Sequence, residues 1–267
     1  MTLGEVLRSA TDYLAERGVD SPRLDAELLL SRSLGLPRID LYTQHDRPLS
    51  EAERSEAREL VRRRGAREPL AYILGDWDFR RLTLKTDPRA LVPRPETELV
   101  VERCLELVAD VPAPRVVDVG TGTGAIALAV KHERPDAHVI ATDASSDALA
   151  LAAENADANG LDVQLIKADL LEGVDGPFDL VVSNPPYVDA NELTEPELAF
   201  EPQEALVDRG QTERLIDQAR FGWLVLEVHE DRARDVAALM ERAGYADVRI
   251  AQDLTGRDRI VEGRWTP

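Results

Sequence analysis

The chain has 267 residues, of which 43% are hydrophobic, and a formal net charge of −19 at pH 7. A chain of this length can bury a substantial core, and it fits one large domain plus a small one better than a single unit. The acidic balance disfavours nucleic acid as a direct partner, because phosphate backbones are bound mainly through lysine and arginine, and it suits a basic protein or a small polar molecule better.

Location and metal content can be predicted from what the sequence lacks. It has no apolar run long enough to span a membrane, and residues 1–21 lack the basic start and apolar core of an export signal, so we expect a cytoplasmic protein without membrane contact. Cys104, the single cysteine, cannot form an internal disulfide, and the four histidines show no ligand spacing. No bound metal is therefore expected, and we expect a monomer.

Residues 1–74 are predicted to form a small helical bundle. A threonine and a glutamate at positions 2 and 5, and a serine and a glutamate at positions 50 and 53, have the spacing of capping boxes. A further helix should start at Ser21 and Pro22 and end at Gly35. Each helix has one apolar face to bury. We interpret the arginine-rich run at residues 62–67 as a solvated helix face.

Residues 75–92 are predicted to form a linker hairpin, since their apolar side chains alternate as in strands. From residue 115 onward strands alternate with helices, which indicates a mostly parallel sheet covered on both faces. The predicted strands span residues 115–119, 137–142, 163–167, 178–183, 222–228, 246–252 and 259–263. The last two are joined by a turn too short for a helical crossover, so they should pair antiparallel. Residues 93–267 are thus predicted to form a Rossmann-like α/β domain of seven strands, one of them antiparallel.

A glycine-rich turn follows the first of these strands. It consists of Gly120, Thr121, Gly122, Thr123 and Gly124. Its glycines permit a tight turn and a close approach of backbone to a ligand. Asp143 ends the second strand, where a carboxylate can accept hydrogen bonds from both ribose hydroxyls of an adenosine. Together they indicate an adenosine-containing cofactor, with NAD and S-adenosylmethionine both open at this point. Asp169 is a candidate for the adenine amino group and Leu170 for an apolar wall beside the ring.

The fourth strand runs into Asn184-Pro185-Pro186-Tyr187, at the edge where open α/β sheets bind ligands. An amide nitrogen is a poor nucleophile, because its lone pair is delocalised into the carbonyl. The side-chain oxygen of Asn184 can accept one N–H of a substrate amide and the Pro185 carbonyl the other, which turns the lone pair toward a methyl sulfonium. Two consecutive prolines stiffen the backbone, and Tyr187 can pack over the planar amide. The motif indicates methylation of such a nitrogen.

With these residues in view, the sequence resembles the N5-glutamine methyltransferases of peptide chain release factors. The resemblance is carried by residues 69–75, 92–98 and 184–187, and it extends through residues 253–259. It implies S-adenosylmethionine as cofactor and S-adenosylhomocysteine as product. The implied cofactor contacts are residues 120–124, Asp143, Leu170 and Asn184, and the implied substrate contacts are residues 184–187.

The resemblance also implies a partner. The N-terminal helical domain would dock a release factor, and the acceptor would be the glutamine of its Gly-Gly-Gln loop. Residues 93–98 should border the acceptor pocket, with Arg94 and Glu98 as candidate substrate contacts. His229 stands where the family has glycine, and we interpret it as a solvent-facing residue at a strand end rather than a new acid or base.

The sequence leaves four alternatives to this function open. Adenine-N6 methylation of DNA or RNA poses the same planar-nitrogen problem and uses similar motifs, but the acidic charge and the lack of a target-recognition domain disfavour it. Glutamine methylation of a ribosomal protein is disfavoured by residues 93–98, which match the release-factor family. A catalytically silent cofactor-binding protein is disfavoured by the intact residues 184–187. An NAD oxidoreductase lacks evident hydride-transfer residues.

Overall fold

The computed structural model describes residues 1–187 and 194–266. The chain divides into two compact units: residues 1–75 with 195–200, and residues 76–194 with 201–267. Each unit has its own hydrophobic core. The short helix η1 (Pro196–Phe200) therefore belongs to the N-terminal unit, although it follows the Asn-Pro-Pro-Tyr motif in the chain. In the described ranges no helix is both long and apolar enough to cross a membrane.

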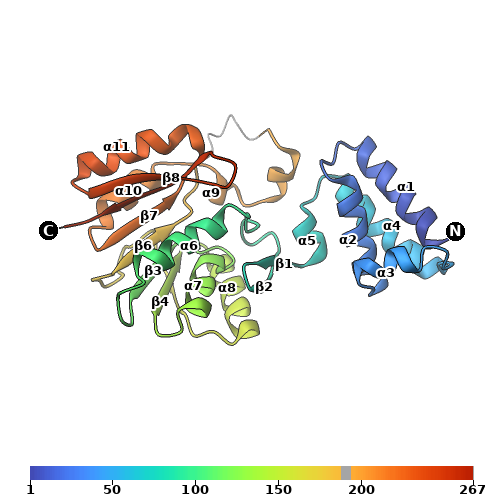
Figure 1. The fold of residues 1–267 in the computed structure, drawn as a ribbon, viewed down its shortest axis with the longest axis horizontal. Helices are drawn as coiled ribbons and strands as arrows, with labels where there is room; N and C mark the ends of the chain where they lie inside the picture. Colours follow the sequence, from blue (N-terminus) through green and yellow to red (C-terminus); the bar gives the residue numbers. More distant parts are fainter. Residues whose placement is uncertain (188–193, 267) are drawn as a thin grey trace. The chain divides into compact units, whose positions relative to one another are not determined.

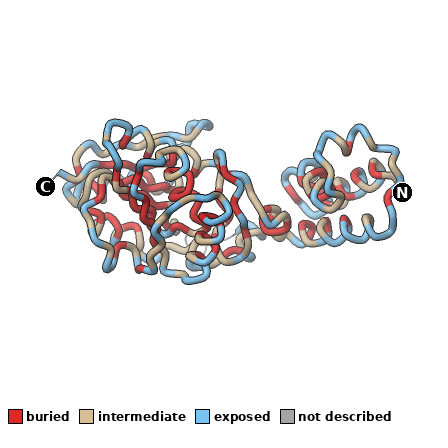
Figure 2. Tube along the Cα trace, turned by 90° about the horizontal axis from the view of Figure 1, so that it is seen from below, coloured by how far each residue is buried: buried red, intermediate tan, exposed pale blue. Residues whose placement is uncertain are grey.

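The N-terminal unit is helical, as predicted. Its helices are α1 (Leu3–Glu16), α2 (Pro22–Leu34), α3 (Arg38–Thr43), α4 (Glu51–Gly65) and α5 (Leu70–Leu74). Both predicted capping boxes are present, at Thr2 and Ser50, and Gly35 ends α2 in the left-handed region. Buried and exposed residues alternate along these helices (Figure 2), which is the pattern of an amphipathic bundle. The short helices α3 and α5 were not predicted, because neither begins with a side-chain cap.

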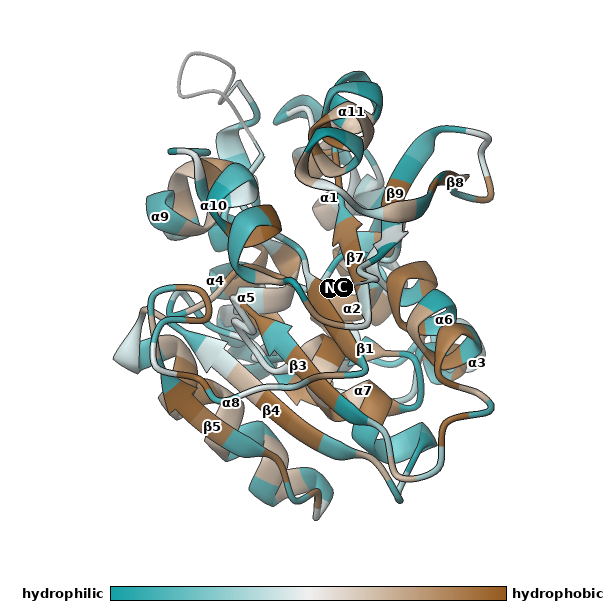
Figure 3. Ribbon diagram, turned by 90° about the vertical axis from the view of Figure 1, so that its left-hand side faces the viewer, coloured by the Kyte–Doolittle hydropathy of each residue, from teal (hydrophilic) through white to brown (hydrophobic). Residues whose placement is uncertain are grey.

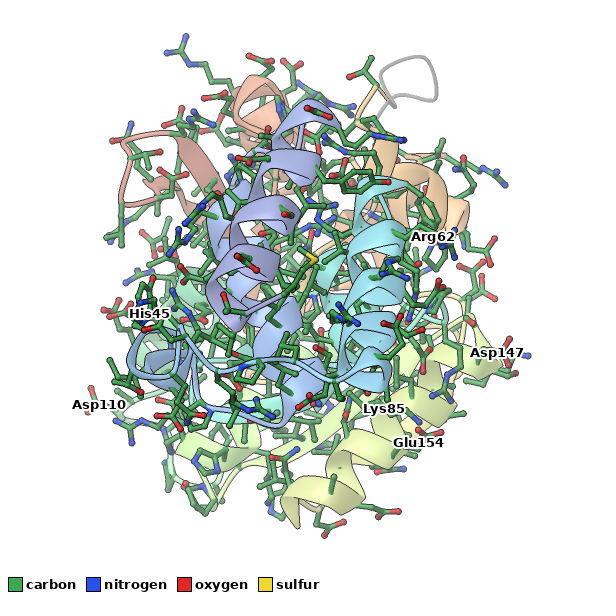
Figure 4. All side chains as sticks on the ribbon, turned by 90° about the vertical axis from the view of Figure 1, so that its right-hand side faces the viewer. His45, Arg62, Lys85, Asp110, Asp147 and Glu154 are labelled. Carbon is green, nitrogen blue, oxygen red and sulfur yellow. The ribbon has the colours of Figure 1, made fainter. Side chains whose placement is uncertain are left out.

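The arginine-rich run differs in part from its interpretation as a solvated face. Arg62 does lie on the outer side of α4 (Figure 4), paired with Glu59. Arg64, however, is buried, and its guanidinium donates to Asp25 at 2.7 Å and to Glu197 at 2.9 Å. Arg67 also pairs with Glu197, at 2.8 Å. The interpretation is thus right for Arg62 and wrong for Arg64, which helps to hold η1 on the helical unit.

A buried carboxylate stabilises the same unit and makes its stability depend on pH. Glu27 accepts hydrogen bonds from Tyr42, from Arg23 at 2.6 Å and from Arg38 at 2.7 Å. Burial raises the pKa of Glu27, but these hydrogen bonds outweigh it and lower the pKa from 4.5 to about 2. A carboxyl whose pKa is lowered on folding stabilises the fold above its unfolded pKa. This contribution should therefore be lost as the pH falls from 4.5 to about 2.

We therefore expect Glu27→Gln to lower the opening free energy of the N-terminal unit by about 1–2 kcal/mol at neutral pH, a value discounted because both arginines are half exposed. The difference should shrink as the pH approaches 2. Hydrogen exchange of the α2 amides in the full chain measures it, with the exposed Glu51→Gln, which breaks a solvent-facing pair with Arg54, as the matched control. An equal loss at neutral and acidic pH would refute the role of the Glu27 charge.

The larger unit begins with the predicted hairpin, formed by β1 (Asp76–Phe79) and β2 (Leu82–Lys85). Its described residues then form a seven-stranded sheet in the order β5-β4-β3-β6-β7-β9-β8 (Figure 1). The strands are β3 (Arg115–Val119), β4 (His138–Asp143), β5 (Gln164–Lys167), β6 (Leu180–Ser183), β7 (Trp223–Glu227), β8 (Ala246–Gln252) and β9 (Asp258–Arg264). Every predicted strand is present, with ends displaced by no more than two residues.

The strand β9 is antiparallel to both of its neighbours, β7 and β8. The prediction of one antiparallel strand in a mostly parallel sheet is confirmed. The last strand of the chain does not lie at the edge, however, because it inserts between β7 and β8.

Helices cover both faces of this sheet. On one face α6 (Thr97–Leu107), α7 (Ala125–Glu133) and α8 (Ser146–Asn159) contribute to one core, and on the other α10 (Gln211–Gln218) and α11 (Ala233–Ala243) contribute to a second. The central strands β3, β4 and β7 between them are mostly hydrophobic (Figure 3). The short helices α9 (Gln203–Leu206) and η2 (Glu230–Arg232) lie in connections. Since β3, β4, β6 and β7 run parallel, the residues that follow them emerge at one edge of the sheet.

Candidate active site

A cavity of about 370 Å³ opens at this edge. Small-molecule sites have volumes of roughly 300–1,000 Å³, so a cofactor-sized ligand suits it. Its lining includes the predicted Gly120, Thr121, Gly122, Thr123, Asp143, Asp169, Leu170, Asn184, Pro185, Pro186 and Arg94. A second cavity, of about 470 Å³, lies where β3 and β4 begin, and none of the predicted site residues lines it.

The glycine-rich turn has the conformation that its glycines permit. Gly120, Gly122 and Gly124 all have positive φ. A side chain at position 124 would meet Leu128 at 3.0 Å, whereas nothing lies within 4 Å of the corresponding point at Gly120. Gly124 starts α7 rather than lining the cavity. The open space at Gly120 leaves room for a ligand against the backbone.

Asp118, which the sequence reasoning did not single out, stabilises the glycine-rich turn by hydrogen bonds. Its Oδ2 accepts hydrogen bonds from the Thr121 hydroxyl at 2.7 Å and from the Ala127 N–H at 3.1 Å. Burial raises the pKa of Asp118 to about 7. The carboxyl thereby ties the end of β3 to the start of α7 across the glycines. The position of Asp118, an acidic residue two positions before Gly120 at the end of a buried strand, could have indicated this role from the sequence.

Asp143 lies beside the turn. Its Oδ2 accepts from the Gly122 N–H at 3.0 Å and its Oδ1 from the Ser145 N–H at 2.9 Å, and the Ala144 N–H also bonds to the carboxylate, which fixes its orientation. Burial raises its pKa, against the effect of these backbone hydrogen bonds. This arrangement suits a ribose diol. Asp169 also lines the cavity but already accepts from Arg214 at 2.6 Å, and Leu170 adopts a positive φ of 56° next to it.

Asn184, at the end of β6, is the last member of a hydrogen-bonded series. Its Nδ2 donates to the Thr97 hydroxyl at 3.5 Å, and that hydroxyl donates to Glu227 Oε2 at 2.6 Å. Thr97 and Glu227 are 4% and 1% exposed, so the series is shielded from water. Burial raises the pKa of Glu227 to about 7, although the Thr97 hydrogen bond and Arg259 lower it. Sequence reasoning placed Thr97 only within residues 93–98, which it expected beside the pocket, and Thr97 does line the cavity. Glu227 was missed, because only the fold brings it to Thr97 and Asn184.

The two candidate substrate contacts in residues 93–98 differ in position. Arg94 lines the cavity, and its guanidinium donates to the buried Glu201. Glu201 also accepts from the Val92 N–H at 3.0 Å, so one carboxylate fixes both the backbone and the arginine. Glu98 does not line the cavity, and its carboxylate accepts from the Arg80 N–H at 3.0 Å.

Tyr187 lies beside the cavity rather than in its lining. Burial, and then the charge of Glu227, raise the pKa of the Tyr187 phenol to about 12, so the ring remains neutral. Its centroid is 6.3 Å from that of His229. The His229 side chain is 45% exposed, and its Nδ1 accepts from the Asp231 N–H at the start of η2. A partly exposed capping residue agrees with the interpretation of His229 as a strand-end residue.

Comparison with known proteins adds independent information. Residues 5–75 match the family model of the PrmC N-terminal domain, and residues 97–217 that of the methyltransferase small domain. The release factor glutamine methyltransferase of Deinococcus radiodurans is 42% identical, covering 99% of both chains, and that of Geobacter sulfurreducens is 41% identical, covering 98% of this chain and 96% of the relative. The chain belongs to the release factor glutamine methyltransferase family.

Family membership confirms the resemblance inferred from the motifs and identifies the chain as a methyltransferase. Solved structures support the fold. The T. thermophilus 16S rRNA N2 G1207 methyltransferase, in complex with AdoMet and guanosine, is 17% identical with a TM-score of 0.55, over 72% of this chain and 50% of that chain. The human Mettl16 catalytic domain is 14% identical with a TM-score of 0.56, over 69% and 75%. This confirms the predicted Rossmann-like methyltransferase fold.

Proposed function

We propose that this protein transfers a methyl group from S-adenosylmethionine to the side-chain amide nitrogen, N5, of the glutamine in the Gly-Gly-Gln loop of a peptide chain release factor. The observation that carries the proposal is that Asn184 and Pro185 line the same cavity as the glycine-rich turn and Asp143. The site thus combines an adenosine cradle with acceptors for an amide. S-adenosylhomocysteine would be the second product, and a translation factor as substrate implies a cytoplasmic reaction.

The residues of the cavity fit the proposed cofactor. The open space at Gly120 admits a ligand against the backbone, and the fixed carboxylate of Asp143 can accept from both ribose hydroxyls. Leu170 offers an apolar surface for the adenine ring, with Asp169 near its amino group. When bound, S-adenosylmethionine supplies an electrophilic methyl group on a positively charged sulfur.

Asn184 and Pro185 would activate the acceptor by orienting it. The Asn184 Oδ1 and the Pro185 carbonyl can each accept one N–H of the glutamine amide, so that the nitrogen lone pair points at the methyl group. As the bond to the methyl group forms, positive charge moves onto the nitrogen and these two oxygens stabilise it. The nitrogen then loses one of its protons to water, so no strong base is required. Pro186 stiffens the carbonyl's position, Tyr187 packs beside the planar amide, and Arg94, fixed by Glu201, borders the entry.

The N-terminal helical unit would dock the release factor. It matches the PrmC N-terminal domain model, and the net charge of −19 suits a basic protein surface. No direct contact with nucleic acid is proposed.

The decisive experiment is methyl transfer from labelled S-adenosylmethionine to a purified release factor, beside a release factor whose Gly-Gly-Gln glutamine is alanine. Label on the unmodified factor alone is the expected result. Label on both would place the acceptor elsewhere in the factor. No label on either, with cofactor binding intact, would favour a ribosomal protein or a nucleic-acid adenine as substrate.

Asp143→Ala should weaken cofactor binding about 10- to 100-fold, because the two ribose hydroxyls lose a charged acceptor worth roughly 1.5–3 kcal/mol. Calorimetric titration with S-adenosylhomocysteine measures this loss. The matched control is Asp147→Ala, which removes an exposed carboxylate of α8 outside the cavity (Figure 4) and should bind as the wild type does. Equal affinity of Asp143→Ala and the wild type would remove Asp143 from the cofactor site.

A further inference from the structure

We infer that Thr97 and Glu227 are positioning residues that determine which end of the Asn184 side-chain amide faces the substrate. The kinetic consequence rests on the proposed function, whereas the hydrogen-bond arrangement itself does not. The two ends of an asparagine side-chain amide have nearly the same shape, but the nitrogen donates hydrogen bonds and the oxygen accepts them. A site that needs the oxygen must fix the nitrogen elsewhere.

The direction of the hydrogen bonds from Asn184 through Thr97 to Glu227 follows from the protons that each group carries. An ionised Glu227 can only accept, so the single proton of the Thr97 hydroxyl is committed to it at 2.6 Å. The Thr97 oxygen can then only accept from Asn184, whose Nδ2 lies 3.5 Å away. The Asn184 Oδ1 is consequently the atom that remains for a substrate N–H. The long second distance leaves room for this contact to shorten when a substrate binds.

The fold brings these residues together from three elements. Thr97 starts α6, Asn184 follows β6 and Glu227 ends β7. The strands β6 and β7 are parallel neighbours with Ser183 opposite Leu226, so Asn184 and Glu227 follow in register. Glu227 does not line the cavity and cannot touch a ligand there. Its influence on Asn184 must pass through Thr97.

Burying the charged carboxylate of Glu227 costs free energy, which indicates that its charge has a function. Within the part of the chain that the structure describes, Glu227 forms no ion pair. Arg259 on β9 and Arg94 before α6 act on it only at longer range and lower its pKa, while Glu96 raises it. Tyr187 stays neutral in the same surroundings.

Protonation of Glu227 should remove the fixed direction of the hydrogen bonds that join Asn184, Thr97 and Glu227. A neutral Glu227 can donate to the Thr97 oxygen, and the freed hydroxyl proton can then point at Asn184 and attract its oxygen away from the substrate. Burial raises the pKa of Glu227 to about 7, so the carboxylate predominates above this pH and the acid below it. Methyl transfer should therefore fall as the pH drops through about 7.

The first test measures kcat and KM across this range on a release factor. Thr97→Val should lower kcat at least about tenfold at all pH values and leave cofactor affinity unchanged. Glu227→Gln is neutral at every pH and, like the protonated carboxyl, can donate to Thr97 as well as accept from it, so its kcat should stay at the lowered value that the wild type reaches at acidic pH and should show no acid limb. Glu262→Gln is the matched control, since it neutralises an equally buried carboxylate that pairs with Arg103 outside the site. Wild-type kcat in Thr97→Val, or an acid limb that persists in Glu227→Gln, would overturn the inference.

The second test needs no substrate. In the ligand-free protein, the Asn184 side-chain amide signal in an NMR spectrum, assigned by its loss in Asn184→Ala, should shift with a midpoint near 7 and stay constant in Glu227→Gln. A constant signal in the wild type would disprove the coupling. A shifting signal together with failure to methylate any release factor would leave the coupling standing and reject the proposed acceptor.

Discussion

Asn184→Ala should leave binding of S-adenosylmethionine close to the wild-type affinity and lower the rate of methyl transfer at least about a hundredfold, which corresponds to about 3 kcal/mol. The loss is expected because the alanine removes one of two acceptors that would orient the glutamine amide. Cofactor binding should persist, because Asp143 and the glycine-rich turn are held by their own hydrogen bonds.

The measurement is single-turnover transfer of labelled methyl to a release factor, with cofactor affinity determined separately by calorimetry. Asn159→Ala is the control, because this side chain bonds to the Thr83 and Asn155 carbonyls away from the cavity. Transfer at the wild-type rate in Asn184→Ala would end the assignment of Asn184 as the amide acceptor. A parallel collapse of cofactor affinity would indicate that its main contacts are with the cofactor.

Sequence reasoning placed in the site those residues that stand in a recognisable motif at the end of a predicted strand. The glycine-rich turn, Asp143 and Asn184 each stand at the end of a strand, and parallel strands bring their ends to one edge. Glu227 carries no such local mark, and Thr97 was placed near the pocket only as part of residues 93–98. Thr97 reads as a helix start and Glu227 as the end of a strand, and their 2.6 Å hydrogen bond joins residues 130 positions apart. Only the packing of α6 against β7 reveals it.

The fold was predictable to a similar extent. Periodicity located the strands to within two residues, because a buried parallel strand is a continuous apolar run. It could not order them, since the insertion of β9 between β7 and β8 depends on which edge is free once the chain has assembled. The ion pairs of Arg64 were hidden for the same reason. The run at residues 62–67 looks solvated until Asp25 and Glu197 are brought to it.

Gly222 carries the largest expected effect on stability, because the start of β7 passes very close to the chain that leads into β6. The Trp223 N–H donates to the Asp179 carbonyl at 2.9 Å, and the Gly222 carbonyl accepts from the Trp265 N–H at 2.8 Å. A Cβ at position 222 would lie 2.1 Å from the Asp179 oxygen and 2.6 Å from its carbonyl carbon. Both are backbone atoms, which cannot rotate aside as a side chain could.

Gly222→Ala should therefore destabilise the larger unit by about 3 kcal/mol or more, and lower its melting temperature by roughly 6–12 °C. Calorimetric unfolding of the full chain measures the change. Gly160→Ala is the matched control: its φ is +63° but nothing lies within 4 Å of the added atom, so only the cost of a left-handed alanine applies, about 1 kcal/mol. Equal losses in the two variants would show that β7 can move away from Asp179. In that case the register that carries Asn184 and Glu227 to the same edge would be less rigid than the close approach at Gly222 implies.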